Sequence, residues 1–235
     1  MRRLVLVHGS VTNGALTWRA QRALADRWKL VVLDRPGFPP GPPVERVDFE
    51  QDAQWLAARL EAGDHLCGHS YGGVVSLLAA PRLRELASLT AIEPPATRAA
   101  AGDPAADAYA AGAIALWRDG PREPEAFLRT FLAAVGSSFQ PPSPLPPDLE
   151  QGARALRNER GPWEAVILVD ELRALPFPKL IVSGGHHAAF DAICDALERD
   201  LGAQRAVCAG AGHSAQRAPG FNETLVDFLE RAETL

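Results

Sequence analysis

Short apolar runs alternate with amphipathic stretches along this chain, and this alternation limits the fold more than any other feature. Six such runs occur, at residues 4–7, 30–33, 65–67, 89–92, 180–183 and 205–208. Runs of this length are typical of strands that are buried on both faces of a parallel sheet. Helical spacing of apolar residues lies between them, at 17–27, 49–61, 74–80, 190–201 and 222–233. The sequence therefore predicts an α/β fold with a doubly wound, mostly parallel sheet.

Polar or glycine-rich residues stand at or soon after the ends of these runs. They are His8-Gly9, Ser70, Glu93, Gly184-Gly185 and His213. Ligands of open parallel sheets bind beyond the carboxyl ends of the strands. We therefore expect these residues to meet at one edge of the sheet and to form an active site.

One of these ends carries the pattern Gly-x-Ser-x-Gly, as Gly68-His69-Ser70-Tyr71-Gly72. In a sharp turn from a strand into a helix the central residue is strained, and small residues are needed two positions before and after it. Such a turn lifts the Ser70 hydroxyl out of the edge of the sheet. The N-terminus of the helix that follows favours negative charge developing there. The pattern predicts that Ser70 is a nucleophile.

Two more motifs stand at matching places in the chain. An early apolar run ends in His8-Gly9-Ser10, and a late one is followed by Gly210-Ala211-Gly212-His213-Ser214. With these motifs, and with the serine preceding the histidine, the chain resembles the α/β-hydrolase family, as a small serine esterase-like member. Segments 34–38 and 217–222 also resemble that family. The resemblance implies the α/β-hydrolase fold.

The alternation of strands and helices stops between residues 96 and 172. Helical patterns continue there, and a proline-rich connector lies at 140–148. An insertion at this point resembles the helical cap of many α/β-hydrolases. We therefore predict a core from residues 1–95 and 173–235 and a helical cap insertion from 96–172, within a single domain overall. Candidates for the walls of a substrate pocket are His187 and the aromatic residues of the cap, Trp117, Phe127, Phe131, Phe139 and Trp163.

Ser70 needs an adjacent base, because a serine hydroxyl is a weak nucleophile at neutral pH. His213 has the loop context and the chain order for this role, so we predict that it acts first as general base and then as general acid. The resemblance also implies two backbone N–H donors for an oxyanion. These come from Tyr71 and from Ser10, with Val11 as the neighbouring candidate.

The acidic member of the triad is where the chain departs from the family. An aspartate is usual a few residues after the strand at 180–183, but that position holds His187. Glu93 follows the strand at 89–92, and an acid there would also face the histidine loop. Asp191 is a second candidate, although an aspartate at the start of a helix also serves as an N-terminal charge. A third possibility is that no dedicated acid exists; of the three, Glu93 is favoured.

Composition narrows the range of partners. The formal net charge is −5 with acids and bases mixed, so nothing indicates a nucleic acid. No segment of about 18 apolar residues exists, and the first apolar run is too short for a signal peptide, so we expect no membrane contact and a cytoplasmic location. His186-His187 has no partner in metal-ligand spacing. We expect a small-molecule substrate, no metal and no cofactor.

These observations predict a serine hydrolase that cleaves a small or medium carboxylic ester, lactone or thioester through an acyl-Ser70 intermediate. Two alternatives remain open. One is a non-hydrolytic enzyme of the same family, such as a lyase, cyclase or acyltransferase, and the missing aspartate favours it. The other is a ligand-binding protein on the same fold, which the pairing of Ser70 with His213 disfavours. The sequence by itself does not define the acyl length, the leaving group or the oligomeric state.

Overall fold

The computed structural model describes residues 1–234, and within them six strands form one sheet. The strands are β1 (Arg3–Val7), β2 (Lys29–Leu33), β3 (His65–His69), β4 (Ser88–Ile92), β5 (Lys179–Ser183) and β6 (Gln204–Val207). Their order is β2-β1-β3-β4-β5-β6, and every neighbouring pair is parallel. The predicted fold class, a doubly wound parallel sheet, is confirmed.

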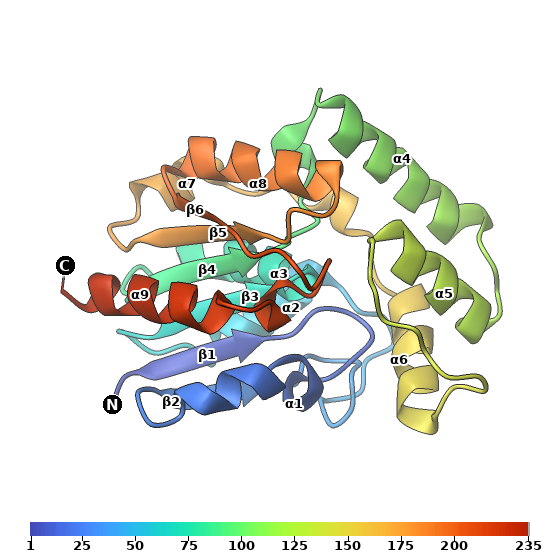
Figure 1. Cartoon of the computed structure of the whole chain (residues 1–235), viewed down its shortest axis with the longest axis horizontal. Coiled ribbons are helices and arrows are strands. Elements are labelled where there is room, and N and C mark those ends of the chain that lie inside the picture. Colours follow the sequence, from blue (N-terminus) through green and yellow to red (C-terminus); the bar gives the residue numbers. More distant parts are fainter. Residues whose placement is uncertain (235) are drawn as a thin grey trace.

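Helices cover both faces of the sheet (Figure 1). In β1, Val5 and Val7 belong to one apolar cluster and Leu4 and Leu6 to another, because successive side chains of a strand point to opposite faces. The first cluster is completed by side chains from α2 (Phe49–Ala57), α3 (Tyr71–Ala79), α7 (Val169–Ala174) and α8 (Ala188–Leu201). The second is completed mainly by α9 (Phe221–Glu233) and by Trp18, Leu24 and Trp28. The sheet therefore lies between two apolar layers, which explains why its central strands are continuous apolar runs.

Other helical segments, the first α-helix and the 3-10 helices, are short. The helix predicted over residues 17–27 is instead α1 (Gly14–Thr17), followed by a 3-10 helix at Arg19–Leu24. Further 3-10 helices lie at Ala80–Arg82, Thr97–Ala100, Pro162–Glu164 and Ala215–Arg217. Within residues 1–234, none of the helices is both long enough and apolar enough to span a bilayer.

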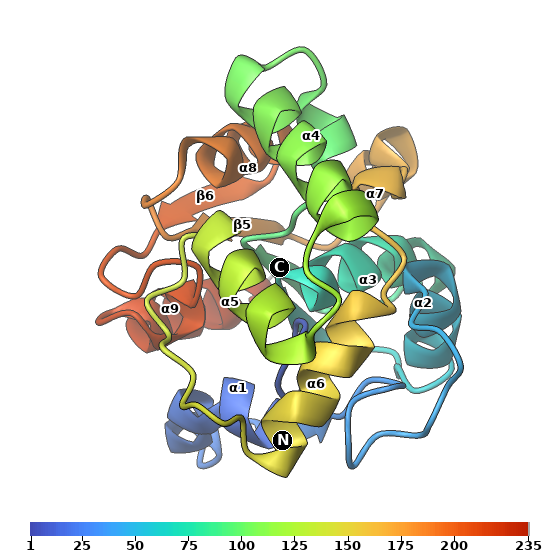
Figure 2. The same ribbon diagram turned by 90° about the vertical axis from the view of Figure 1, so that its right-hand side faces the viewer.

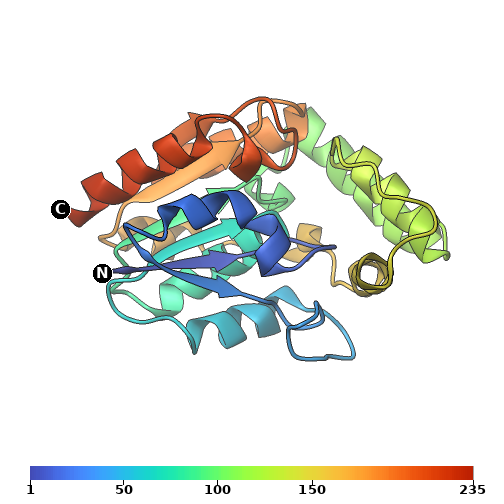
Figure 3. The same ribbon diagram turned by 60° about the horizontal axis from the view of Figure 1, so that its bottom comes forward.

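Three helices stand beyond the carboxyl ends of the strands, and we call them the outer helices. They are α4 (Pro104–Asp119), α5 (Pro124–Ala134) and α6 (Pro147–Arg157). Figures 1 and 3 show them at one end of the sheet, and Figure 2 shows them in front of the strand ends. Each begins with proline, which suits a first turn whose amide needs no partner. They share a small apolar core that includes Phe127, Leu128 and Leu156, together with Val11 from the loop after β1.

The strand order reverses at β1, which lies between β2 and β3. The chain leaves β1 towards one face of the sheet and leaves β3, through α3, towards the other. The loops after these two strands therefore diverge and leave a crevice, where doubly wound sheets bind their ligands. The outer helices stand over this crevice.

Candidate active site

Ser70 lies between the end of β3 and the first residue of α3, in a conformation that few residues adopt. Its backbone has φ 54° and ψ −126°. The turn is tight on both sides: a Cβ atom on Gly68 would collide with the Gly72 carbonyl, and one on Gly72 would collide with the His8 carbonyl. Glycine is therefore required at both positions, as the sequence pattern predicts.

Backbone strain is concentrated at this edge of the sheet. Within residues 1–234, positive φ occurs at three residues other than glycine, namely Val11, Ser70 and Glu93. They follow β1, β3 and β4 respectively. Such conformations cost about 1–3 kcal/mol each and gather at functional sites. Their positions mark the edge where the polar residues of three strand ends meet.

Ser70, His213 and Glu93 form an unbroken series of hydrogen bonds. The Ser70 hydroxyl lies 2.8 Å from Nε2 of His213. Nδ1 of His213 lies 3.0 Å from Oε2 of Glu93. The other oxygen of Glu93 accepts the Gly184 amide at 2.5 Å, and the Glu93 side chain is fully buried. The Glu93 carboxylate is thus held with one oxygen directed at the histidine.

Asp191, the other carboxylate considered, lies in different contacts. Its Oδ1 accepts the Ser183 hydroxyl at 2.5 Å and lies 3.6 Å from Arg205. It stands in the first turn of α8, where its charge is favourable next to the helix N-terminus. His187, which occupies the usual position of the aspartate, caps the same helix by accepting the Ala189 amide at 3.2 Å. In this chain, the position where the family usually has an aspartate therefore holds the N-cap of α8.

The Glu93–His213 pair is buried, and burial penalises charge on either group. It lowers the pKa of His213 to about 3 and raises the pKa of Glu93 to about 7. Because the two groups share a hydrogen bond, a proton bound by either belongs to the pair, and Glu93 takes up the first one as the pH falls through about 7. Above that pH, His213 is neutral beside an ionised Glu93, which is the state in which it can accept the Ser70 proton.

We therefore expect kcat/KM for an ester to rise with pH through an apparent pKa of about 7. In Glu93→Gln, the residual rate should have its midpoint at lower pH, because the carboxyl with a pKa of about 7 is removed and burial keeps the pKa of His213 at about 3. Initial rates measured between about pH 5 and pH 9 test both expectations. A flat wild-type profile over this range would point to a base other than His213.

The loop after β1 offers amides that are free to bind a ligand. In the described part of the chain, the Ser10 and Val11 amides donate no hydrogen bond to a protein group. Tyr71 follows Ser70 directly at the first position of α3. The three amides predicted from the resemblance thus belong to the segments that follow β1 and β3, which flank the crevice.

A buried ionic network holds this loop in place. Glu159 accepts the Ser10 hydroxyl at 2.6 Å and Nη2 of Arg35 at 3.3 Å. Arg35 also donates to Asp52 at 2.9 Å and to the Gly9 carbonyl at 3.0 Å. The carboxylates of Glu159 and Asp52 compensate the charge of Arg35, which is fully buried. Since Glu159 follows α6, the network connects the outer helices to the loop that carries Ser10.

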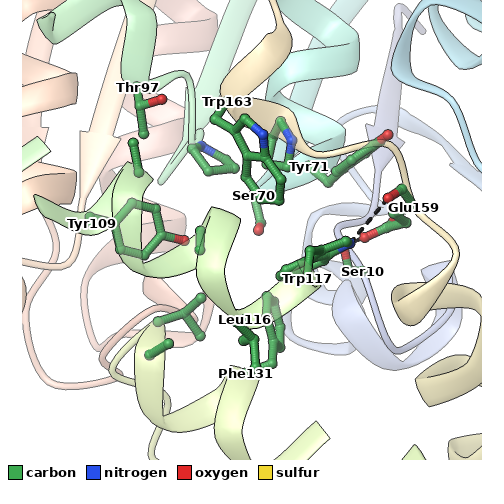
Figure 4. Close-up of a pocket in the computed structure, with 16 residues that line it drawn as sticks. Ser10, Ser70, Tyr71, Thr97, Tyr109, Leu116, Trp117, Phe131, Glu159 and Trp163 are labelled. Carbon is green, nitrogen blue, oxygen red and sulfur yellow. Dashed lines mark hydrogen bonds between the residues drawn. The ribbon is translucent and has the colours of Figure 1, made fainter. Parts of the chain in front are cut away.

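A cavity lies between Ser70 and the helices α4 and α5, and we call it the inner pocket. It is narrow, with a cavity volume of about 30 Å³. Most of its wall is apolar, and its large members are Tyr71, Tyr109, Leu116, Trp117, Phe131 and Trp163 (Figure 4). The hydroxyls of Ser70 and Tyr109 point into the same central space (Figure 4). Burial raises the pKa of Tyr109, so its hydroxyl stays protonated and can donate a hydrogen bond.

A second cavity opens on the other side of Ser70, and we call it the outer pocket. Its cavity volume is about 420 Å³, and its wall is more polar. His213 contributes to its wall and does not contribute to that of the inner pocket, whereas Ser10 and Ser70 line both. The two cavities therefore meet at Ser70 but differ in their access to the histidine.

The aromatic residues suggested by the sequence fall into three groups. Trp117, Phe131 and Trp163 line the inner pocket, and Phe131 also reaches the outer one, together with Phe139. Phe127 lines neither pocket, because it is fully buried in the core of the outer helices. His187 also lines neither, because it caps α8.

Sequence reasoning did not anticipate Tyr109, Glu159 or the role of Arg35. Arg35 stands in the 34–38 segment that resembles the family, which was the one available signal. Tyr109 and Glu159 stand in the part of the chain that matched no motif. Only the packing of the outer helices against the crevice reveals them.

Glu93, His186 and His213 each bring one potential metal ligand within 4.8 Å of the others. However, Oε2 of Glu93 and Nδ1 of His213 already form a hydrogen bond, at 3.0 Å. A cation at this point would displace that bond and separate the histidine from its carboxylate. The donor set therefore suits a serine–histidine–acid series better than a resident metal.

The fold and these contacts define the class to which the chain belongs. A family model described as "Alpha/beta hydrolase family" matches residues 4–221. This protein belongs to the alpha/beta hydrolase family.

Individual relatives are more distant. A pimeloyl-[acyl-carrier protein] methyl ester esterase from Aeromonas hydrophila is 39% identical over 75 residues, which are 31% of this chain and 30% of that enzyme. The match therefore spans well under half of that relative's length. A thermophilic esterase from Thermogutta terrifontis has a TM-score of 0.70 at 22% identity and covers 99% of this chain and 90% of its own. The enol-lactonase from Burkholderia xenovorans has a TM-score of 0.64 at 21% identity, covering 97% and 91%. At these identities the two structures show a common fold.

Proposed function

We propose that this protein is a serine hydrolase that cleaves a small or medium carboxylic ester, lactone or thioester. Ser70 would be the nucleophile, His213 the general base and acid, and Glu93 the acid that orients the histidine. The observation that carries the proposal is the unbroken series of hydrogen bonds from the Ser70 hydroxyl through His213 to Glu93. Relatives whose names include methyl ester esterase, esterase and enol-lactonase support this substrate class.

The proposed reaction begins when the substrate carbonyl lies against the Ser70 hydroxyl. His213 takes the serine proton at Nε2 while the Ser70 oxygen bonds to the carbonyl carbon. The amides of Tyr71 and Ser10 then stabilise the oxyanion, and each such donor contributes about 3 kcal/mol in comparable sites. Collapse of this intermediate expels the leaving oxygen or sulfur, which takes the proton from His213. Water then cleaves the acyl-Ser70 ester with the same groups.

Residues 96–172 serve, in this proposal, as a cap that closes the inner pocket. Three observations support it: the outer helices lie over the crevice, they supply Trp117 and Phe131 to the pocket wall, and Glu159 bonds the oxyanion loop. The wall of the pocket is mostly apolar, which suits the hydrocarbon part of an acyl group.

The non-hydrolytic alternative loses its main support. It rested on the absence of an aspartate at the usual position, and Glu93 supplies a carboxylate to His213 from the neighbouring strand end. Hydrolysis of p-nitrophenyl esters by the purified protein is the direct test. An enzyme that forms an acyl-Ser70 adduct but releases no acid would restore the alternative.

Acyl-chain selectivity tests the inner pocket. Trp163→Ala should shift the ratio of kcat/KM for octanoyl and butyryl p-nitrophenyl esters towards the longer chain by about 10-fold, because it enlarges an apolar wall. Phe139→Ala is the matched control, since Phe139 lines the outer pocket alone. Equal ratios in the wild type and in Trp163→Ala would show that the acyl chain lies elsewhere.

A further inference from the structure

The two pockets are not equivalent for a substrate that reacts at Ser70. If the proposed function holds, His213 must pass its proton to the leaving atom, so the leaving group has to lie within reach of Nε2. His213 lines the outer pocket and does not line the inner one. The acyl group therefore belongs in the inner pocket, and the leaving alcohol or thiol belongs in the outer pocket.

The outer pocket carries two exposed arginines from distant parts of the chain. Arg19 begins the 3-10 helix that follows α1, and Arg217 ends the one that follows the His213 loop. A hydrogen bond from Nη2 of Arg217 to the Leu16 carbonyl, at 2.9 Å, directs the Arg217 side chain back to the segment that carries Arg19. Both arginines thus line the pocket that also holds His213.

These two positive charges are not neutralised by the protein. Within residues 1–234, no carboxylate lies within 4.0 Å of either guanidinium group. Asp148 of α6 is the acidic residue in the wall, and it too is beyond that distance. Partial burial of the Arg217 side chain lowers its pKa, and the positive charge of Arg19 lowers it further.

We propose that Arg19 and Arg217 bind an anionic group, a carboxylate or a phosphate, on the leaving alcohol or thiol of the substrate. A carboxylate or phosphate between two guanidinium groups accepts charge-assisted hydrogen bonds and offsets the repulsion between the two positive charges. The anion would also hold the leaving atom near His213 while the acyl group fills the inner pocket. The inference rests on the proposed function and specifies, in addition, that the leaving group is negatively charged.

The test compares esters that differ only in this charge. Butyryl esters of 3-hydroxybenzoate and 3-hydroxybenzamide have leaving groups of nearly the same shape, and the butyryl ester of 3-hydroxyphenyl phosphate distinguishes phosphate from carboxylate. For the wild type, kcat/KM should be about 10-fold or more higher for one of the two anionic esters than for the ester of 3-hydroxybenzamide. Arg19→Gln and Arg217→Gln should each reduce this ratio, and the double variant should bring it close to one. Arg22→Gln is the matched control, because Arg22 lies in the same 3-10 helix but does not line the pocket.

The outcomes separate this inference from the proposed function. Equal turnover of charged and neutral esters by the wild type would overturn the anion site but not the proposed hydrolase function. An effect of Arg22→Gln as large as that of Arg19→Gln or Arg217→Gln would do the same. If neither ester is hydrolysed, the proposed function fails. Calorimetric titration of the wild type with 3-hydroxybenzoate, 3-hydroxyphenyl phosphate and 3-hydroxybenzamide then tests the site without catalysis. Tighter binding of an anion than of the amide, lost in the double arginine variant, supports the site, and equal affinities overturn it.

Discussion

Ser70→Ala is expected to lower kcat for p-nitrophenyl butyrate by about 10⁴-fold or more, because no other hydroxyl is positioned on the strained turn beside His213. The midpoint of thermal unfolding should stay within about 3 °C, since the substitution removes one hydroxyl and leaves the packing of the turn unchanged. Steady-state rates and a thermal melt of the same preparation test the two halves of this expectation.

Ser76→Ala is the matched control for the nucleophile. Ser76 is a second buried serine in α3, and its hydroxyl donates to the Gly72 carbonyl at 2.7 Å. It should leave turnover within a few-fold of the wild type. A fluorophosphonate probe should label the wild type and Ser76→Ala at Ser70 and should leave Ser70→Ala unlabelled. Full activity in a folded Ser70→Ala protein would exclude Ser70 as the nucleophile.

Glu93→Gln should reduce kcat by about 10³–10⁴-fold with little change in KM. In the proposed mechanism, the carboxylate fixes the tautomer of His213 by accepting from Nδ1, at 3.0 Å, and stabilises the imidazolium that forms during the reaction. An amide keeps the size of the side chain but can present an NH₂ group to Nδ1, which favours the wrong tautomer. The loss should therefore appear in the chemical step, and pre-steady-state acylation rates measure it.

Asp191→Asn provides the comparison for Glu93. Because Asp191 contacts Ser183 and Arg205 and makes no contact with His213, its loss should change kcat by only a few-fold. Any effect should fall on stability, at about 1 kcal/mol for a charge in a first helical turn. A large loss at Asp191 with none at Glu93 would reverse the assignment. Small losses at both would mean that Ser70 and His213 act as a dyad.

Glu159 gives the outer helices a role beyond covering the pocket. Its carboxylate bonds Ser10, whose amide is a proposed oxyanion donor, and it helps neutralise Arg35 inside the protein. A shift of the segment after α6 would therefore alter the oxyanion loop as well as the pocket wall. Substrate selectivity and the rate of the chemical step are for this reason not independent properties of the site.

The sequence by itself determined the six strands, the Ser70 turn and the histidine loop. These features depend on local physics: apolar runs mark strands buried on both faces, and the turn excludes any side chain at Gly68 and Gly72. Both kinds of signal lie within a few consecutive residues, so they can be recognised without the fold.

Only the tertiary structure decided which carboxylate reaches His213, because Glu93 and Asp191 were both compatible with the order of the strands. The hydrogen bond between Ser10 and Glu159 joins residues 149 positions apart, and the bond between Leu16 and Arg217 joins residues 201 apart. No local pattern encodes such contacts. They arise when the outer helices and the loops pack at the carboxyl edge of the sheet, and that packing creates the two pockets and their different charge.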